Sequence, residues 1–79
     1  MLFYKREIEI IQKHGGENID TYTLINNHGI TFDYKGKRYD ARYWANCYGA
    51  SLNKYIIHPT TDDAVINQIE KELNTKGEL

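Results

Sequence analysis

The sequence predicts a small α+β domain in which an antiparallel β-meander of three to four strands packs against a C-terminal helix, with a second helix at the N-terminus. Residues 30–43 alternate between apolar and polar types around Lys35-Gly36, a pattern typical of a β-hairpin. Residues 64–73 instead place their apolar side chains on one face of a helix. The length of 79 residues allows a single domain, residues 1–79, with one modest core.

The N-terminal segment, residues 3–14, carries two competing patterns. Tyr4, Ile8 and Ile11 form an apolar stripe at helical spacing, whereas the isoleucines that alternate with glutamates are typical of a strand. Positive charge in the last turn favours a helix because it interacts well with the negative end of the helix dipole, and the glycine pair that follows is a common helix terminator. We therefore expect a helix here.

The next segment, Thr21 to Ile25, is β-branched and aromatic and therefore predicts a strand. Asn26 to Gly29 follows with residue types that favour a turn, so this strand and the one that starts at Ile30 would form a second hairpin. A short helix is the alternative, since Asp20 could cap its start and Gly29 could end it.

The turn at Lys35-Gly36 sets the register of the central hairpin. A two-residue loop there pairs apolar residues with apolar ones and opposite charges with each other: Ile30 with Ala41, Phe32 with Tyr39, and Asp33 with Arg38. A loop at Gly36-Lys37 would keep the same faces but set Asp33 against Asp40, and like charges directly opposite are unfavourable. We therefore predict the loop at Lys35-Gly36.

The hairpin then presents two faces. One should pack on a helix and consists of Ile30, Phe32, Tyr39, Ala41 and Tyr43. The other consists of Thr31, Asp33, Arg38, Asp40, Arg42 and Trp44. This second face is the candidate site because Trp and Arg are enriched among the residues that dominate binding energy; the alternative is that Trp44 turns inward and the charges only solvate the sheet. The predicted partner-binding residues are Lys35, Lys37, Arg38, Arg42, Trp44 and Tyr48.

The C-terminal third contributes a loop, a strand and a helix. Residues 45–51 are small and polar enough for a loop, and Tyr55 to His58 is typical of a last short strand that Pro59 ends. Thr60 to Asp63 supplies an N-cap and early acidic charge for a helix from Ala64 to Leu73. The apolar face of that helix consists of Val65, Ile66, Ile69 and Leu73.

The residue types form no catalytic or metal-binding pattern. Cys47 is the one candidate nucleophile, and residues 46–49 (Asn-Cys-Tyr-Gly) resemble the Asp-Cys-Ser-Gly run of papain-like cell-wall peptidases at the Cys and the Gly. Its base would have to be His28 or His58, and a buried structural thiol is the interpretation that we favour. The histidines also lack the paired spacing of a zinc site. We therefore expect no catalysis, no metal and no cofactor.

Charge is nearly balanced overall but unevenly distributed. The formal net charge is −1, yet residues 34–55 carry five lysines and arginines against Asp40 alone. Such a basic segment indicates a partner-facing patch. The first residues are charged where a signal peptide needs an apolar run, one cysteine allows no internal disulfide, and no stretch is apolar enough to span a membrane. We therefore expect a cytoplasmic protein.

Together these features favour a non-enzymatic protein-binding module. Trp, Tyr and Arg are enriched at protein interfaces, and neighbouring acids fix a partner's orientation. In size and α+β layout the chain is similar to small phage-encoded inhibitors, anti-CRISPR proteins among them, which implies a phage or mobile-element inhibitor or adaptor that acts on a host protein. The alternative is a nucleic-acid-binding module that uses the basic aromatic segment 34–55, although Asp33 and Asp40 lie on the same face. Self-association into a homodimer would stabilise so small a core.

Overall fold

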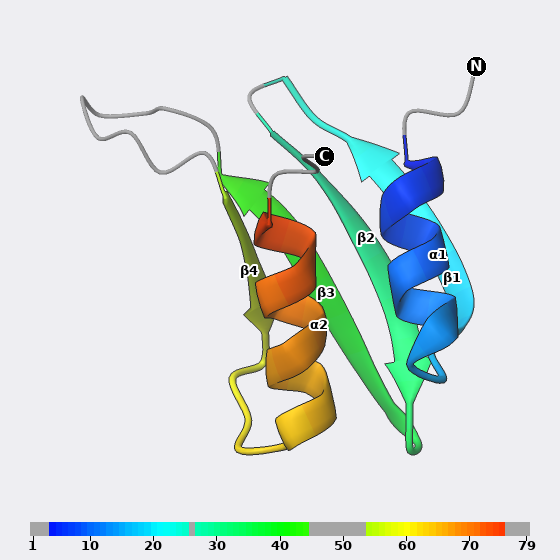
Figure 1. The fold of residues 1–79 in the computed structure, drawn as a ribbon. Coiled ribbons are helices and arrows are strands. Elements are labelled where there is room, and N and C mark those ends of the chain that lie inside the picture. The colour runs from blue at the N-terminus through cyan, green and yellow to red at the C-terminus, as the bar shows by residue number, and fades with distance from the viewer. Residues whose placement is uncertain (1–3, 26, 45–53, 76–79) are drawn as a thin grey trace.

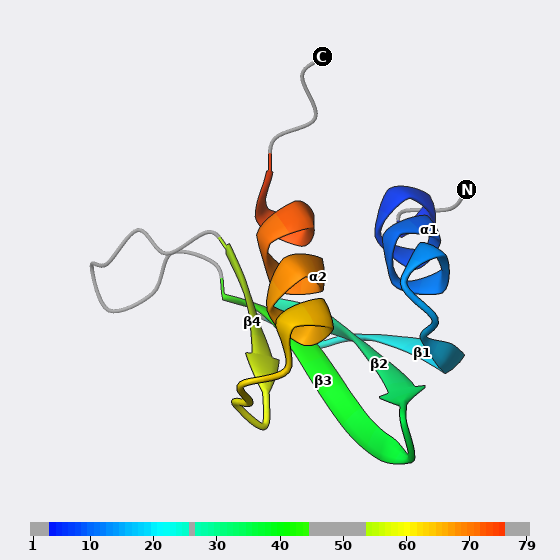
Figure 2. The ribbon, with the colours of Figure 1, turned by 60° about the horizontal axis from the view of Figure 1, so that its bottom comes forward.

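The computed structural model of the 79-residue chain describes residues 4–25, 27–44 and 54–75. Its elements are α1 (Lys5–Lys13), β1 (Glu17–Thr23), β2 (Asn27–Tyr34), β3 (Lys37–Trp44), β4 (Lys54–His58) and α2 (Ala64–Asn74). The strands form one antiparallel sheet in the order β1-β2-β3-β4, and both helices lie on the same side of it (Figure 1). The fold therefore has two layers (Figure 2), and the predicted α+β class is confirmed. The predicted loop at residues 45–51 lies outside the described residues.

The β2–β3 hairpin forms in the predicted register. Lys35 and Gly36 occupy a two-residue turn with φ angles of 52° and 79°. Positive φ at both turn residues matches the right-handed twist of the strands that they connect. The predicted cross-strand pairs are all present: Ile30 with Ala41, Phe32 with Tyr39, and Asp33 with Arg38. Because successive side chains point to opposite faces of a sheet, this register separates an apolar face from a polar one.

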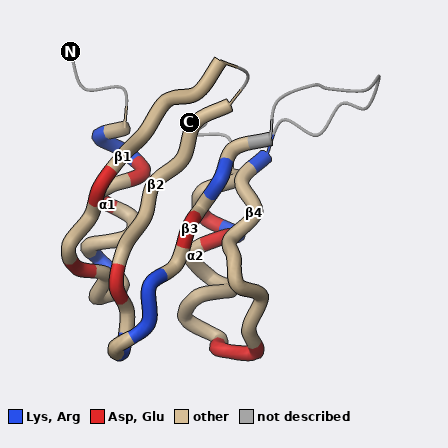
Figure 3. Tube along the Cα trace, turned by 180° about the vertical axis from the view of Figure 1, so that it is seen from behind, with Lys and Arg blue, Asp and Glu red and all other residues tan. Residues whose placement is uncertain are grey.

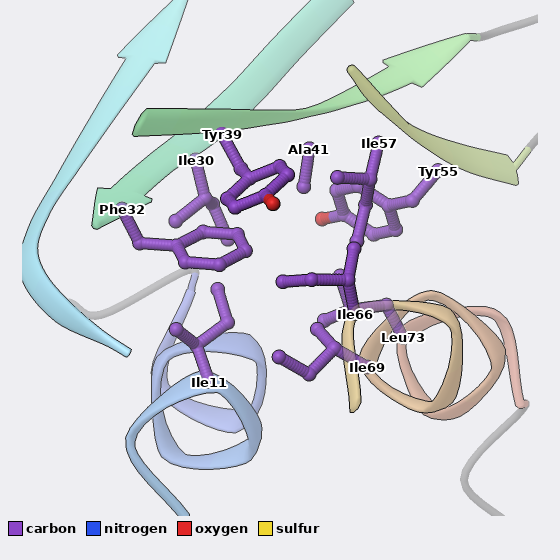
Figure 4. Packing of buried hydrophobic residues seen from close by; sticks show 10 residues of the cluster. All are labelled: Ile11, Ile30, Phe32, Tyr39, Ala41, Tyr55, Ile57, Ile66, Ile69 and Leu73. Carbon is purple, nitrogen blue, oxygen red and sulfur yellow. The ribbon is translucent and has the colours of Figure 1, made fainter. Parts of the chain in front are cut away.

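The core lies between the sheet and the two helices (Figure 4). Full burial of one large apolar side chain stabilises a fold by about 1.5–3 kcal/mol before entropy is counted. The buried residues are Ile11 from α1, Ile66, Ile69 and Leu73 from α2, and Ile30, Phe32, Tyr39, Ala41, Tyr55 and Ile57 from the sheet. The sheet face that was predicted to pack on a helix is therefore the face that forms the core.

Both predicted helices are present, with ends that their residue types explain. Asp63 caps α2 by accepting hydrogen bonds from the backbone N–H groups of Val65 at 2.8 Å and Ile66 at 3.3 Å. These donors have no partner within the helix, so the aspartate stabilises its start. Within the ambiguous segment, residues 3–14, Lys5–Lys13 is helical as expected and forms α1.

Arg6 joins α1 to the C-terminal end of α2. Its guanidinium donates hydrogen bonds to the carbonyl oxygens of Glu72 at 2.9 Å and Thr75 at 2.6 Å. Carbonyl groups at the end of a helix have no donor within the helix, and a cation there also interacts well with the negative end of the dipole. This contact therefore holds the two helices side by side.

Glu72 is a second link between the helices. Its carboxylate lies 2.9 Å from Lys13 Nζ and 3.0 Å from His14 Nε2, and it accepts a hydrogen bond from Gln68 Nε2 at 2.9 Å. These contacts, Gln68 first and then Lys13 and His14, lower the pKa of Glu72 to about 2. The carboxylate is therefore ionised throughout the neutral range, where it can bind Lys13 of α1 and His14, which directly follows this helix.

β1 differs from its prediction. It begins at Glu17 rather than Thr21 and ends at Thr23. A β-bulge follows Glu17, with Asn18 at a φ of 50°, and shifts the register against β2. The extra residue breaks the period of two, so the sequence pattern did not indicate the first half of the strand. The alternative helix from Asp20 is wrong.

The turn between β1 and β2 also lies earlier than predicted. Leu24 N donates to Asn27 O at 2.6 Å across this turn. His28 and Gly29 consequently belong to β2, and the predicted turn at Asn26 to Gly29 is wrong. Both residues contribute to packing instead of to a turn. The His28 ring stacks on Tyr43, and the Tyr22 ring lies against Gly29.

Gly29 allows the ring of Tyr22 to lie across β2 on the surface of the sheet. The ring of Tyr22 in β1 lies over this glycine, and a Cβ atom at position 29 would overlap the Tyr22 hydroxyl group. Only a residue without a side chain permits such an approach. Tyr22 can therefore reach over β2 to contact side chains of β3.

Side chains of α2 cover the free edge of β4. Asn74 Oδ1 accepts from Tyr55 N at 2.6 Å, and Asn74 Nδ2 donates to Tyr55 O at 3.0 Å. Two residues further along β4, Ile57 N donates a hydrogen bond to Glu70 Oε2 at 3.1 Å. An edge strand with open backbone groups is a template for pairing with another chain. At β4, both backbone groups of Tyr55 and the N–H group of Ile57 already have partners within the molecule.

Substitution of Gly29 by alanine tests the packing of Tyr22. We expect Gly29→Ala to lower the free energy of unfolding by about 1–3 kcal/mol, because the ring must move and the packing is strained. The same substitution in a Tyr22→Ala background should cost much less, since the space is then empty. Urea denaturation of the four proteins measures both values. If Gly29→Ala lowers the free energy of unfolding equally with and without Tyr22→Ala, the position of the Tyr22 ring does not depend on Gly29.

Candidate functional site

The sheet face that points away from the helices is the candidate functional site, and we call it the outer face. Its residues on β2 and β3 alternate with the buried core residues. Figure 3 views the molecule from this side and shows basic and acidic positions following one another along β3. The outer face consists of Asp20, Tyr22, Thr31, Asp33, Arg38, Asp40 and Arg42.

Arg38 is the centre of one hydrogen-bonded group on the outer face. Its Nη1 donates to Asp33 Oδ1 at 3.0 Å and to Asn18 O at 2.7 Å. Its Nη2 donates to Asp20 Oδ2 at 3.1 Å and to Thr31 Oγ1 at 2.8 Å. One guanidinium of β3 thus holds side chains of β2 and the bulged backbone of β1. The Arg38 side chain is still 42% exposed, so a partner could contact it.

Asp33 completes this group. Its Oδ2 accepts a hydrogen bond from Asn18 Nδ2 at 2.8 Å, while its Oδ1 accepts from Arg38. These two contacts, Asn18 first and Arg38 second, hold the pKa of Asp33 below its ordinary value because they favour the charged form. The group therefore presents a fixed negative charge beside a fixed positive one.

Tyr22 of β1 is the centre of a second hydrogen-bonded group on the outer face. This group includes Arg42, which lies four residues after Arg38 on β3. Its hydroxyl donates to the Asp40 carboxylate, with oxygen distances of 2.9 and 3.1 Å, and accepts from Arg42 Nε at 3.0 Å. Arg42 Nη2 lies 3.5 Å from Asp40 Oδ2, and its guanidinium carbon lies 5.9 Å from the centre of the Tyr22 ring. Partial burial raises the pKa of Tyr22, against the hydrogen bond from Arg42, which lowers it. The hydroxyl therefore keeps its proton at neutral pH.

The two groups give the outer face a definite chemical character. Arg38 and Arg42 project from the same strand, and each is in contact with at least one aspartate. All of these side chains are exposed or half-buried. The face can consequently offer guanidinium donors, carboxylate acceptors and one aromatic ring to a partner.

The remaining predicted site residues lie away from these groups. Lys35 and Lys37 are exposed at the tip of the β2–β3 hairpin, and Lys35 Nζ lies 5.3 Å from the centre of the Tyr34 ring. The backbone of Trp44 pairs with Asn27 and Lys54, while its side chain lies outside the described part of the structure. Tyr48 also lies outside the described residues.

The contribution of β1 to the outer face was not predicted from the sequence. Asp20 and Tyr22 reach it because β1 pairs with β2 at the side opposite β3. The alternation of these two residues with Thr21 and Thr23 was the available signal. It predicted a strand but not its neighbours, since strand order depends on tertiary pairing.

A second cluster, the His28 cluster, lies on the helix side of the sheet. The His28 ring stacks on Tyr43 with ring centres 4.8 Å apart and also lies 5.3 Å from Tyr4 and 5.8 Å from Tyr55. His28 Nε2 is 3.2 Å from the Tyr55 hydroxyl, which lies 3.5 Å from a Glu7 carboxylate oxygen. The sequence placed His28 in a turn, so it did not indicate this aromatic environment.

Burial changes the protonation behaviour of the His28 cluster. Loss of water around the ring lowers the pKa of His28, and the negative charge of Glu7 only partly offsets this. Burial, followed by the charge of Glu7, raises the pKa of Tyr55 well above its ordinary value. Both groups are therefore neutral at neutral pH, and the cluster acts as a packed extension of the core.

The structure also has a shallow groove between the helices. It encloses about 450 Å³ and is lined by Arg6, Glu9, Ile10, Lys13, Glu72 and Thr75. Lys13 and Glu72 already bind each other across the helices, and Arg6 binds carbonyl oxygens at the end of α2. Within residues 4–25, 27–44 and 54–75, no group of three or more His, Cys, Asp and Glu side chains could hold a metal ion. The outer face therefore remains the better candidate site.

No family model matches the chain, and no curated protein or solved structure matches it significantly. Neither helix of the described part of the chain is long and apolar enough to cross a membrane. The function must accordingly be argued from the outer face itself.

The lowered pKa of His28 predicts that acid destabilises the fold. Below about pH 6.5 the unfolded chain takes up a proton that folded His28 resists, so stability should fall by up to about 1 kcal/mol per pH unit. In His28→Phe, which keeps a ring beside Tyr43, this loss between pH 6.5 and 5 should shrink. Urea denaturation at a series of pH values measures it. An unchanged slope in both His28→Phe and His28→Asn would assign the proton to another group.

Proposed function

We propose that the chain is a non-enzymatic protein-binding module that covers a site on a target protein with its outer face. The observation that carries this proposal is the pairing of Arg38 and Arg42 with aspartates and a tyrosine on a sheet face that no described helix covers. Arginine and tyrosine are the residue types that most often anchor protein interfaces. The outer face presents both on rigid strands.

The order of the outer face supports a role in binding. Arg38 makes four hydrogen bonds and Arg42 contacts Tyr22 and Asp40, so both side chains are held before a partner arrives. Immobilising a long side chain on binding costs about 0.5–1.5 kcal/mol, and a side chain that is already held avoids much of this cost. The partner would then meet a preformed pattern of charges.

The acidic residues favour a protein partner over a nucleic acid. Asp20, Asp33 and Asp40 lie within hydrogen-bond distance of the two arginines and would repel a phosphate backbone. A protein surface can instead meet both signs of charge, which also fixes the orientation of the partner. Exposed Lys35 and Lys37 at the hairpin tip are the feature that keeps nucleic-acid binding as the second candidate.

We further propose that the target is a host protein and that the chain is a cytoplasmic inhibitor or adaptor of a phage or mobile element. Its small size and two-layer α+β layout support this role, because such a module can act simply by covering a functional surface. Trp44 and Tyr48, which follow the outer face in the sequence, would add aromatic contacts to the same interface.

Affinity capture from a bacterial lysate, with and without nuclease, tests the proposal. We expect one protein to be retained at near-stoichiometric yield in both conditions and to be identified by mass spectrometry. Retention of many proteins that nuclease abolishes would instead assign nucleic-acid binding. Affinity for nucleic acid would then fall steeply with salt, because binding releases counterions.

The purified target then allows a direct test of the outer face. We expect Arg42→Ala to weaken binding by about 2 kcal/mol, roughly 30-fold, as for an interface hot spot. Lys71→Ala is the matched control, since it removes one exposed positive charge from α2 on the helix side of the sheet. Isothermal titration measures both, and circular dichroism checks the fold. Parental affinity in Arg42→Ala and Trp44→Ala alike would place the interface elsewhere.

A further inference from the structure

The two edges of the sheet differ in how many of their outward backbone groups are bound by side chains. On β4, side chains of α2 bind the N–H and carbonyl groups of Tyr55 and the N–H group of Ile57. On β1, within the described residues, side-chain hydrogen bonds to the backbone reach Asn18 O and Tyr22 O, and none reaches Thr21 or Thr23. The edge of β1 is therefore the one that could accept another strand.

The hydrogen-bonding pattern shows which groups of β1 face outward. Leu24 N bonds to Asn27 O, and in an antiparallel ladder hydrogen-bonded and non-hydrogen-bonded pairs alternate. Tyr22 therefore bonds to Gly29, whereas the backbone groups of Thr21 and Thr23 point away from β2. By the same alternation, the backbone groups of Tyr55 and Ile57 on β4 point away from β3. Asn74 and Glu70 of α2 form hydrogen bonds with them.

Exposed apolar side chains lie at the end of the same edge. Leu24 is 52% exposed and Ile25 is 99% exposed, and both follow directly after β1. Two adjacent exposed aliphatic residues beside an open strand edge favour association, because pairing would remove apolar surface from water. The edge thus combines open backbone donors and acceptors with apolar side chains.

We propose that β1 pairs antiparallel with β1 of a second copy of this chain, about a two-fold axis at Tyr22. This register sets Thr21 opposite Thr23 of the second copy, so both outward residues of each copy form ladder hydrogen bonds. It also sets Asp20 opposite Leu24 of the second copy, and no like charges face each other in this segment. The two Tyr22 residues are opposite each other at the axis, and their rings extend away from it over Gly29 of their own copies.

The pairing extends the outer face. Antiparallel pairing about a two-fold axis perpendicular to the sheet keeps both outer faces on the same side. The dimer would then have a continuous sheet with β4 at both ends, and at both ends the edge is closed by α2. Two outer faces in one rigid unit would bind a repeated or dimeric target with increased avidity.

Sedimentation velocity of the purified chain, from micromolar to millimolar concentration and without any target, tests the pairing. We expect a concentration-dependent monomer–dimer equilibrium. Thr21→Pro removes an outward N–H group that β2 does not use, and should raise the dissociation constant about tenfold or more. Thr21→Val keeps that group and is the control, with a change of about threefold at most. Because Ile25 is fully exposed, Ile25→Asp should also weaken the dimer without affecting the fold.

Hydrogen exchange of individual amides identifies the edge directly. In the dimer the amides of Thr21 and Thr23 should exchange slowly, and their protection should increase with protein concentration. A chain that stays monomeric at millimolar concentration would overturn the proposal. So would a dimer in which these two amides exchange freely, or protection that arises only when a target protein is added, which would assign the edge to that target. Because no target is required, these outcomes are independent of the binding test on Arg42.

Discussion

The tight turn at Lys35 and Gly36 is the constraint on which the rest of the structure depends. A slip of one residue in the pairing of β2 with β3 would move the core side chains of one strand to the outer face and its charged side chains into the core. Positive φ at both turn residues fixes the register against this slip. β1 and β4 then add to the two sides of the hairpin, and the helices cover the apolar face alone.

Because the helices cover only one face of the sheet, the polar side chains of the other face form their hydrogen bonds with one another and with the sheet backbone. Arg38 does so at one end by joining three strands and the bulge, and Tyr22 does so further along by reaching across Gly29 to Asp40 and Arg42. The hydrogen bonds that stabilise the outer face are thus the same ones that would hold its side chains in place for the partner that we propose. Stability and binding would then be coupled at these residues, so each variant requires a separate measurement of folding.

α2 has two structural roles. Its buried face completes the core, while Asn74 and Glu70 occupy the backbone groups of β4 that would otherwise invite another strand. Among residues 4–25, 27–44 and 54–75, no side chain gives β1 comparable cover at Thr21 and Thr23, and the exposed Leu24 and Ile25 follow this strand. This asymmetry is the reason that we propose association at β1. On the helix side of the sheet, His28 packs among tyrosines, and the loss of water around its ring lowers its pKa.

Local pattern determined much of this protein. The alternation around Lys35-Gly36 determined the hairpin, its register and the division into an apolar and a polar face, and the spacing after Asp63 determined α2. These features follow from neighbours in the chain, so they can be predicted from sequence. Tertiary structure alone decided the bulge at Asn18, the position of β1 and the place of Gly29 under the Tyr22 ring. Each of these depends on contacts between strands that are distant in sequence, and no local pattern encodes which side chain will cross which strand.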